Sequence, residues 1–298
     1  MDLRTHVSPT QIERARQLAI RGLLHYQPFR FTDEFSVGAG LSIESGAKAS
    51  PPLVELTGAD RFANQEFCDR FVVREKDRPA FQAANARMRA LYDGLIEDVI
   101  AAVGGVEGKT VLDVGCNAGY FLVRLAQRGA AAAVGLDREP YGETVDLLNE
   151  ICGTNVQFRQ WTYDGSLQSP EQFDLVISFA VLGHLSEPLR HLAWLGSAAR
   201  EALWVFAHTH RTGRLGIEFQ AVNRYYQGEW PHCFDVVTLS RPLLHLAFEQ
   251  MQFACADVPP RARTMSARWR RMHESIVGRR STGATVSAPS GSMSRATS

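Results

Sequence analysis

A strand, a turn of small residues and a helix follow one another between residues 110 and 127. The strand is Thr110–Val114, the turn runs from Gly115 to Gly119, and the helix begins near Tyr120. The two glycines let a ligand approach the backbone closely, because neither carries a Cβ. The helix N-terminus also presents free N–H groups at this point. The segment therefore predicts a ligand site at the carboxyl end of a strand.

Acidic residues stand at the ends of two predicted strands. Asp113 belongs to the first, and Asp137 follows Ala133–Leu136. A carboxylate at the first position can bind an ammonium, and one at the second can hold both hydroxyls of a ribose. The Gly-x-x-x-Gly spacing differs from the Gly-x-Gly-x-x-Gly turn of dinucleotide-binding proteins, which disfavours a dehydrogenase.

Three motifs resemble those of class I S-adenosylmethionine-dependent methyltransferases. They are Leu112-Asp113-Val114-Gly115-Cys116-Asn117-Ala118-Gly119, then Val134-Gly135-Leu136-Asp137, then Phe173-Asp174-Leu175-Val176-Ile177-Ser178 followed by Val181–Leu185 and Pro188. The resemblance covers roughly Val106 to Val258. It implies an α/β fold with a doubly wound, mostly parallel, Rossmann-like sheet, and S-adenosyl-L-methionine as the cofactor.

Strands and helices alternate through this part of the chain, which independently predicts a parallel sheet. The expected strands are Thr110–Val114, Ala133–Leu136, Val156–Gln160, Asp174–Phe179, Ala202–Ala207 and Phe253–Val258. The expected helices are Tyr120–Gln127, Tyr141–Asn149, Pro188–Leu195 and Arg241–Gln250.

We divide the chain into three parts. Residues 1–105 form a helical N-terminal lid, with helices over Ser8–His25 and Asp77–Val103 and a hairpin or extended arm over Phe29–Ile43. Residues 106–260 form the cofactor-binding core, with an insertion at 208–235 that is too long for a plain connection. Residues 261–298 are a basic, solvated segment and a Ser/Thr/Gly/Ala-rich tail of disordered composition.

The resemblance also implies cofactor contacts. Asp113, Gly115, Asn117 and Gly119 match the turn that holds the methionine part, with backbone N–H groups binding the carboxylate. Further expected cofactor contacts are Cys116, Tyr120 and Phe121. Asp137 matches the ribose-binding acid, and Arg138 could lie against the adenine. Trp161 and Thr162 stand where the family often has an acid, and Trp161 either stacks on adenine or packs in the core. Phe179 and Ala180 resemble the wall beside the sulfonium.

Methyl transfer mainly requires that nucleophile, methyl and sulfur be aligned. A general base helps when the acceptor is a hydroxyl or a carbon acid, and the candidate bases are His184, His208 and His232. Aromatic residues of the insertion, Tyr225, Tyr226 and Trp230, suit an organic acceptor pocket, with a self-packed surface loop as the alternative. No ligand spacing indicates a metal site.

The composition of the chain argues against some classes of binding partner. The formal net charge is zero, which argues against a general attraction to nucleic acid. Five scattered cysteines, the lack of a signal-peptide pattern and the lack of a long apolar run fit a cytoplasmic protein away from membranes. We expect a small organic acceptor with O-methylation favoured over N- or C-methylation, and a homodimer if the chain associates.

Two other functions stay open. Gly119-Tyr120-Phe121 and Val181–Leu185 are similar to enzymes that modify the wobble uridine of tRNA, some of which use a carboxylated cofactor. An inactive cofactor-binding scaffold is disfavoured, because Asp113, Gly115, Gly119 and Asp137 are all intact.

Overall fold

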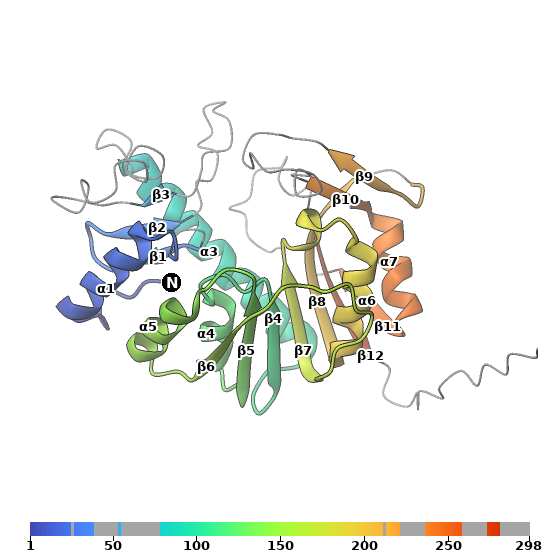
Figure 1. Ribbon diagram of the computed structural model, residues 1–298, viewed down its shortest axis with the longest axis horizontal. Coiled ribbons are helices and arrows are strands. Elements are labelled where there is room, and N and C mark those ends of the chain that lie inside the picture. The colour runs from blue at the N-terminus through green and yellow to red at the C-terminus, as the bar shows by residue number, and fades with distance from the viewer. Residues whose placement is uncertain are drawn as a thin grey trace, which may run out of the picture.

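A computed structural model describes residues 1–24, 27–38, 53–54, 78–210, 213–220, 236–257 and 273–280. Its centre is a twisted sheet in the order β11-β12-β8-β7-β4-β5-β6 (Figure 1). The strands are β4 (Thr110–Val114), β5 (Ala132–Asp137), β6 (Val156–Gln160), β7 (Phe173–Phe179), β8 (Ala199–His210), β11 (Phe253–Asp257) and β12 (His273–Arg280). Neighbours from β6 to β8 pair in parallel, whereas β12 is antiparallel to both β8 and β11. The predicted doubly wound, mostly parallel sheet is confirmed.

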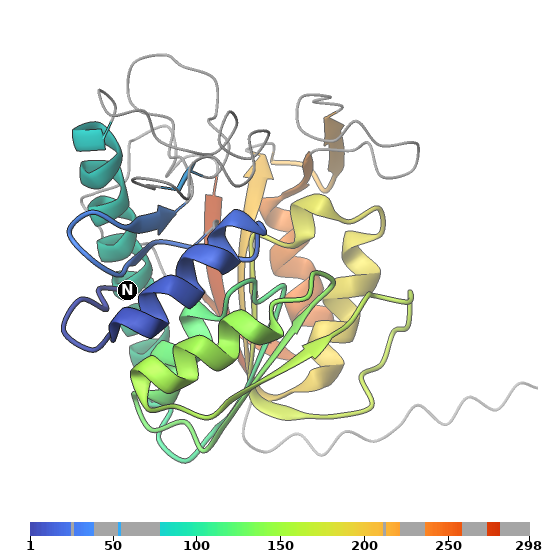
Figure 2. The same cartoon turned by 60° about the vertical axis from the view of Figure 1, so that its left-hand side comes forward.

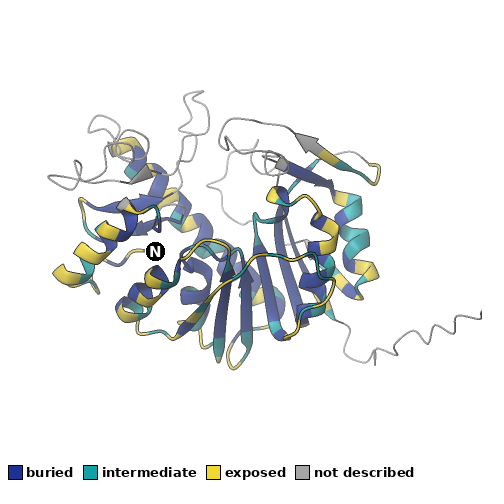
Figure 3. Cartoon of the chain, viewed as in Figure 1, coloured by how far each residue is buried: buried dark blue, intermediate teal, exposed yellow. Residues whose placement is uncertain are grey.

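Helices cover both faces of this sheet (Figures 1 and 2). One face carries α3 (Arg78–Val103), α4 (Tyr120–Ala126) and α5 (Gly142–Cys152), and the other carries α6 (Pro188–Ala198) and α7 (Arg241–Gln250). Alternation along each strand feeds both layers: Val111 packs with the first set of helices and Leu112 with the second. Figure 3 shows the sheet buried between these layers.

The first part of the chain packs beside the α5 side of the sheet. Helix α1 (Pro9–Ile20) starts at a complete capping box, in which Ser8 and Gln11 each bond the other's backbone N–H. β1 (Phe29–Arg30) and β2 (Ser36–Gly38) form an antiparallel hairpin, and β3 (Leu53–Val54) pairs with β2. The expected helices and hairpin are therefore present, while the role of lid stays a prediction.

The sheet extends past the boundary expected at residue 260. Strand β12 lies inside the segment that we expected to be basic and solvated, and its Ile276 and Val277 are fully buried. The charged residues at both ends of the strand conceal this short apolar run in the sequence. The side chain of Arg280 is itself held by the protein, because it donates to the carbonyl oxygens of Ala199, Gly196 and Met251.

Strand β8 is also longer than expected, since it continues through His208 to His210. Beyond it, β9 (Ile217–Gln220) and β10 (Val236–Ser240) pair with each other, and β10 adds in parallel to the end of β8. The insertion thus carries elements of its own. Among the described residues, no helix is both long and apolar enough to cross a membrane.

Candidate cofactor and acceptor site

The turn between β4 and α4 has the backbone that its glycines permit. Gly115 has φ of 78° and Gly119 has φ of 82°, both in the left-handed region. A Cβ on Gly115 would also collide with Cγ2 of Val181, which follows β7. Glycine is therefore needed at position 115 for both backbone and space. Gly119 is the N-cap of α4 and supplies no side chain to cap it.

Asp113 is the outstanding polar group of the site. It is 1% exposed, and neither carboxylate oxygen has a hydrogen-bond partner among the described residues. Burial, with a contribution from the charge of Asp137, raises the pKa of Asp113 to about 8. An ionised carboxylate left unpaired in the interior is costly unless a cation joins it. The ammonium of a methionine moiety is such a cation, so the residue fits the cofactor implied above.

Asp137 ends β5 beside the same turn. Its Oδ2 accepts a hydrogen bond from the Asn117 N–H at 2.9 Å, and its Oδ1 accepts one from the Glu139 N–H at 3.1 Å. Burial raises the pKa of Asp137, and these two hydrogen bonds oppose that rise. Each carboxylate oxygen keeps a second lone pair, as binding two ribose hydroxyls requires.

The backbone N–H groups of the turn are already used. Those of Gly115 and Cys116 donate to the Leu136 carbonyl, and that of Gly119 donates to Cys116. Asn117, Ala118 and Tyr120 donate to side chains of Asp137, Asn117 and Gln27 respectively. The expected clamp on the cofactor's carboxylate is therefore not preformed by these six groups, since each has an internal acceptor.

Three predicted contact residues lie in the protein interior. Cys116 packs against β5, where a Cβ on Gly135 would come within 2.6 Å of its Sγ. Tyr120 is fully buried and donates its hydroxyl to Asp93, and Phe121 stacks on Tyr92. Their side chains pack in the protein interior, so any cofactor contact from these three residues would come from the backbone.

The predicted adenine side lies after β6. The backbone N–H of Trp161 donates to the Asp137 carbonyl at 2.8 Å, and its indole stacks on Trp194 at a centroid distance of 4.8 Å. Core packing thus holds one side of Trp161, and adenine stacking stays a prediction. Thr162 is exposed. Arg138 is 60% exposed and pairs with Glu139, so it points toward solvent.

The predicted sulfonium wall is at the carboxyl end of β7. Phe179 stacks on its register partner Phe206 of β8, with the ring centroids 4.4 Å apart. Ala180 has φ of 60°, a strained value for alanine, and its N–H donates to Phe206. This left-handed backbone conformation turns the chain from β7 into the short helix η3 (Leu182–His184).

Two of the candidate bases lie beyond this wall. His184 is exposed at the end of η3, and His208 lies near the end of β8. Burial lowers the pKa of His208 to about 4, and the neighbouring His184 contributes to the shift. His232 and the predicted pocket residues Tyr225, Tyr226 and Trp230 lie outside the described residues. No group of three or more potential metal ligands occurs in the described parts of the chain.

Sequence reasoning missed two residues of the site. Tyr92 of α3 lies close enough to Asp113 for that charge to affect its pKa, but in the sequence it is one more aromatic residue in a helix. Gln27 reaches the turn from the N-terminal segment, across 93 residues of sequence. A single glutamine between predicted elements gives no signal of such a contact.

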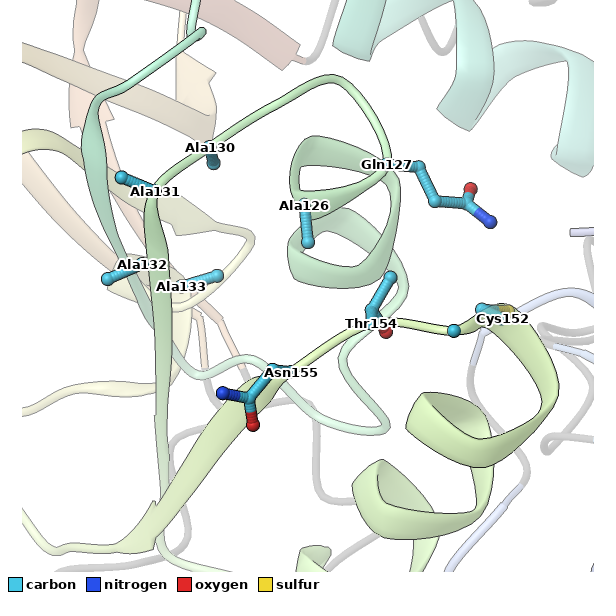
Figure 4. Close-up of a pocket in the computed structure, with 10 residues that line it drawn as sticks. Ala126, Gln127, Ala130, Ala131, Ala132, Ala133, Cys152, Thr154 and Asn155 are labelled. Atoms are coloured by element: carbon cyan, nitrogen blue, oxygen red, sulfur yellow. The ribbon is translucent and has the colours of Figure 1, made fainter.

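A separate cavity of about 430 Å³ opens at the other end of the sheet (Figure 4). Its lining includes Ala126, Ala132 and Cys152, and Ala132 is the first residue of β5 whereas Asp137 is the last. The cavity is therefore remote from the two acids and does not belong to their site.

The chain is similar to known proteins in sequence and in structure. A methyltransferase domain matches residues 85–255. A ubiquinone biosynthesis O-methyltransferase of Pseudomonas fluorescens is 40% identical over 86 residues, 28% of this chain and 37% of that protein. A tRNA U34 carboxymethyltransferase of Aeromonas hydrophila is 33% identical over 106 residues, 35% of this chain and 32% of that protein. The chain thus spans about a third of each relative's length.

Among solved structures, magnesium protoporphyrin IX methyltransferase of Synechocystis PCC 6803 with bound SAH is similar, with a TM-score of 0.48 and 19% identity. That match covers 66% of this chain and 87% of the other. The domain match covers more than half of the chain, and the three motifs, the strand order and the two acids agree with it. This protein belongs to the class I S-adenosylmethionine-dependent methyltransferase family.

Proposed function

We propose that the protein transfers the methyl group of S-adenosylmethionine to a hydroxyl of a small organic molecule. The observation that carries this proposal is the placement of His184 and His208 next to the Phe179–Ala180 wall, at the carboxyl ends of β7 and β8. Ligands of open α/β sheets bind at these strand ends. A hydroxyl acceptor benefits from a base there, whereas an amine acceptor needs one less.

The cofactor supplies an activated methyl group on a sulfonium, so the protein needs only to orient the reactants and accept a proton. In this proposal Asp113 binds the ammonium and Asp137 binds the ribose. Phe179 and Ala180 flank the sulfonium, and the insertion residues Tyr225, Tyr226 and Trp230 line the acceptor pocket.

His184 takes the hydroxyl proton in this scheme. His184 is exposed, so the proton can pass from it to solvent, and the lowered pKa of His208 keeps that second imidazole neutral at neutral pH. His208 then serves as an uncharged wall or as an alternative acceptor of the proton.

The experiment is product detection with the purified protein. S-adenosylmethionine is offered with phenols and catechols, with amines, or with unmodified tRNA, and products are identified by mass spectrometry. We expect methylated hydroxyls, and we expect His184→Ala to lower kcat by about 10²-fold or more while leaving the cofactor Kd unchanged. His6→Ala, at an exposed position near the start of the chain, is the matched control. Exclusive N-methylation would overturn the proposal.

A second candidate is modification of tRNA. It is favoured by the similarity to the Aeromonas hydrophila tRNA U34 carboxymethyltransferase. In the same experiment this function predicts a modified nucleoside in digested tRNA, with no turnover of phenols. The zero net charge and the match over only a third of that relative make it the weaker candidate. A cytoplasmic location and a homodimer remain part of the leading proposal, and sedimentation of the full chain tests the dimer.

A further inference from the structure

Gln27 bonds both ends of the cofactor-binding turn with one amide. Its side-chain nitrogen donates to the Cys116 carbonyl at 3.1 Å, and its oxygen accepts from the Tyr120 N–H at 2.9 Å. The side chain is 6% exposed, so water does not compete for these bonds. Cys116 lies in the turn and Tyr120 is the first residue of α4.

Within the turn, the Cys116 carbonyl also accepts from the Gly119 N–H, whereas the Tyr120 N–H donates to the Gln27 side chain. Gly119 is the N-cap of α4 and has no side chain that could accept from the helix N–H groups. The amide of Gln27 performs this capping function from a distant part of the chain. An amide suits the position better than a carboxylate or a hydrocarbon, because one donor and one acceptor are needed a few ångströms apart.

The segment that carries Gln27 is fixed to the protein independently of the turn. The Leu23 carbonyl accepts from the hydroxyl of Thr144 on α5 at 2.7 Å, and Thr144 is fully buried. Arg21 forms two hydrogen bonds with Glu143 at 2.8 Å. Inside the segment itself, the Leu3 N–H donates to the Arg30 carbonyl and the Phe31 N–H donates to the Phe35 carbonyl, which orders it internally. The described residues 3–24 and 27–35 thus form a docked arm, and Gln27 contacts the turn.

We propose that Gln27 is a positioning residue of the cofactor site, and that docking of this arm and binding of the cofactor are coupled. The amide holds Cys116 and Tyr120 at a fixed separation, so the backbone of the turn beside Asp113 and Asp137 is ordered before the cofactor arrives. Preorganisation of this kind raises affinity because less conformational entropy is lost on binding. By linkage, the cofactor stabilises the docked arm by the same factor. The inference rests on the family's cofactor and not on the proposed acceptor.

The variant Gln27→Met tests the role of the amide. It keeps a side chain of similar length and removes both hydrogen bonds. We expect its Kd for S-adenosylhomocysteine, measured by calorimetry, to rise about tenfold or more, as the loss of two buried hydrogen bonds implies. We also expect the Tyr120 amide to exchange faster with solvent. The matched control is Thr144→Val, which loosens the arm at Leu23 without touching the turn.

The outcomes separate positioning from plain stability. At an equal loss of melting temperature, Gln27→Met should raise the Kd for the ligand more than Thr144→Val does. A Kd equal to or tighter than that of the unaltered protein would show that Gln27 only fills the site, and would overturn the proposal. Failure of the unaltered protein to bind the ligand would instead count against the cofactor assignment.

A second measurement needs no variant, and it decides the matter if Gln27→Met does not fold. Hydrogen exchange of the unaltered protein is followed at Leu3 and Phe31 with and without S-adenosylhomocysteine. Coupling predicts slower exchange at both amides in the presence of the ligand. Unchanged exchange at saturating ligand would contradict coupling between the arm and the site.

Discussion

Asp113, one residue before the end of β4, and Asp137, the last residue of β5, lie on neighbouring parallel strands, and the charge of Asp137 helps to raise the pKa of Asp113 to about 8. In the part of the chain that the structure describes, Asp113 has no hydrogen-bond partner, while Asp137 accepts two backbone hydrogen bonds. The protein thus fills part of the hydrogen-bonding capacity of Asp137, whereas Asp113 depends on a ligand for its partner. This difference gives the two carboxylates different experimental signatures.

The first prediction concerns protons released on cofactor binding. Below about pH 8 the buried Asp113 holds a proton in the free protein, whereas pairing with the cofactor's ammonium requires the carboxylate. At pH 7 binding should therefore release a proton, and affinity should increase as the pH rises from 6 to 7.5. Calorimetry in buffers of different ionisation enthalpy measures this release. In Asp113→Asn the release should vanish, and a release of equal size there would assign the proton to another group.

The second prediction concerns stability without the cofactor. A carboxyl whose folded pKa is raised stabilises the fold at low pH, and that contribution is lost as the pH rises from its unfolded value of about 4 toward 8. At pH 8 the ligand-free variant Asp113→Asn should therefore unfold at a higher temperature than the unaltered protein, although it binds the cofactor more weakly. Scanning calorimetry at pH 5 and pH 8 checks this, because the advantage should shrink at pH 5. A variant less stable at pH 8 would contradict the burial cost assigned to Asp113.

The third prediction tests the ribose assignment. Asp137→Ala should weaken cofactor binding by about 1.5–3 kcal/mol, the scale of hydrogen bonds to a charged group. Asp146→Asn, an exposed acid on α5, is the control for a change of net charge. Titration with S-adenosylmethionine gives both constants. If the two variants bind alike, Asp137 does not contact the ribose.

Much of the fold follows from the sequence because the strands are apolar and the turns carry glycine. Val156–Gln160 and Arg241–Gln250 have the predicted bounds, the latter because Ser240 caps the helix and Pro242 follows at its second position. Strand β12 was missed because only Ile276 and Val277 mark it between charged residues. Its position between β8 and β11 depends on pairing across the chain, which no local pattern encodes.

The site residues likewise divide into those that the local sequence indicates and those that it does not. Asp113 and Asp137 could be found from the sequence, because each lies at or next to the end of an apolar strand. The bonds of Gln27 and the use of all six turn N–H groups could not, because they depend on how a distant segment docks. Exposure of Arg138 and burial of the Tyr120 and Phe121 side chains likewise depend on tertiary packing.

The fourth prediction separates space from backbone at the turn. Gly115→Ala places a methyl group against Cγ2 of Val181 at a φ of 78°. Gly153→Ala introduces the same change at a φ of 64°, where nothing lies within 4 Å of the new Cβ. The second variant should cost about 1 kcal/mol of stability, the backbone penalty alone, and should bind the cofactor normally. The first should cost more and should lose most cofactor affinity. Gly115→Ala combined with Val181→Ala should recover part of the loss, and no recovery would mean that the backbone alone demands glycine.

The fifth prediction concerns Arg280, which joins β12 to the ends of α6 and α7. Its guanidinium donates to three carbonyl oxygens and lies 4.5 Å from the ring centroid of Phe253. Replacement with methionine keeps most of the packing and leaves the three carbonyls without this donor, so the free energy of unfolding should fall by about 2–4 kcal/mol. Arg279→Met, at the exposed neighbouring position, should change it by less than about 0.5 kcal/mol. Urea denaturation compares the two. Because Arg280 contacts Ala199 at the start of β8, at the end of the sheet opposite the cofactor turn, the Kd for S-adenosylhomocysteine should stay the same in both. Equal stabilities would show that β12 is held by its strand pairing and not by this side chain.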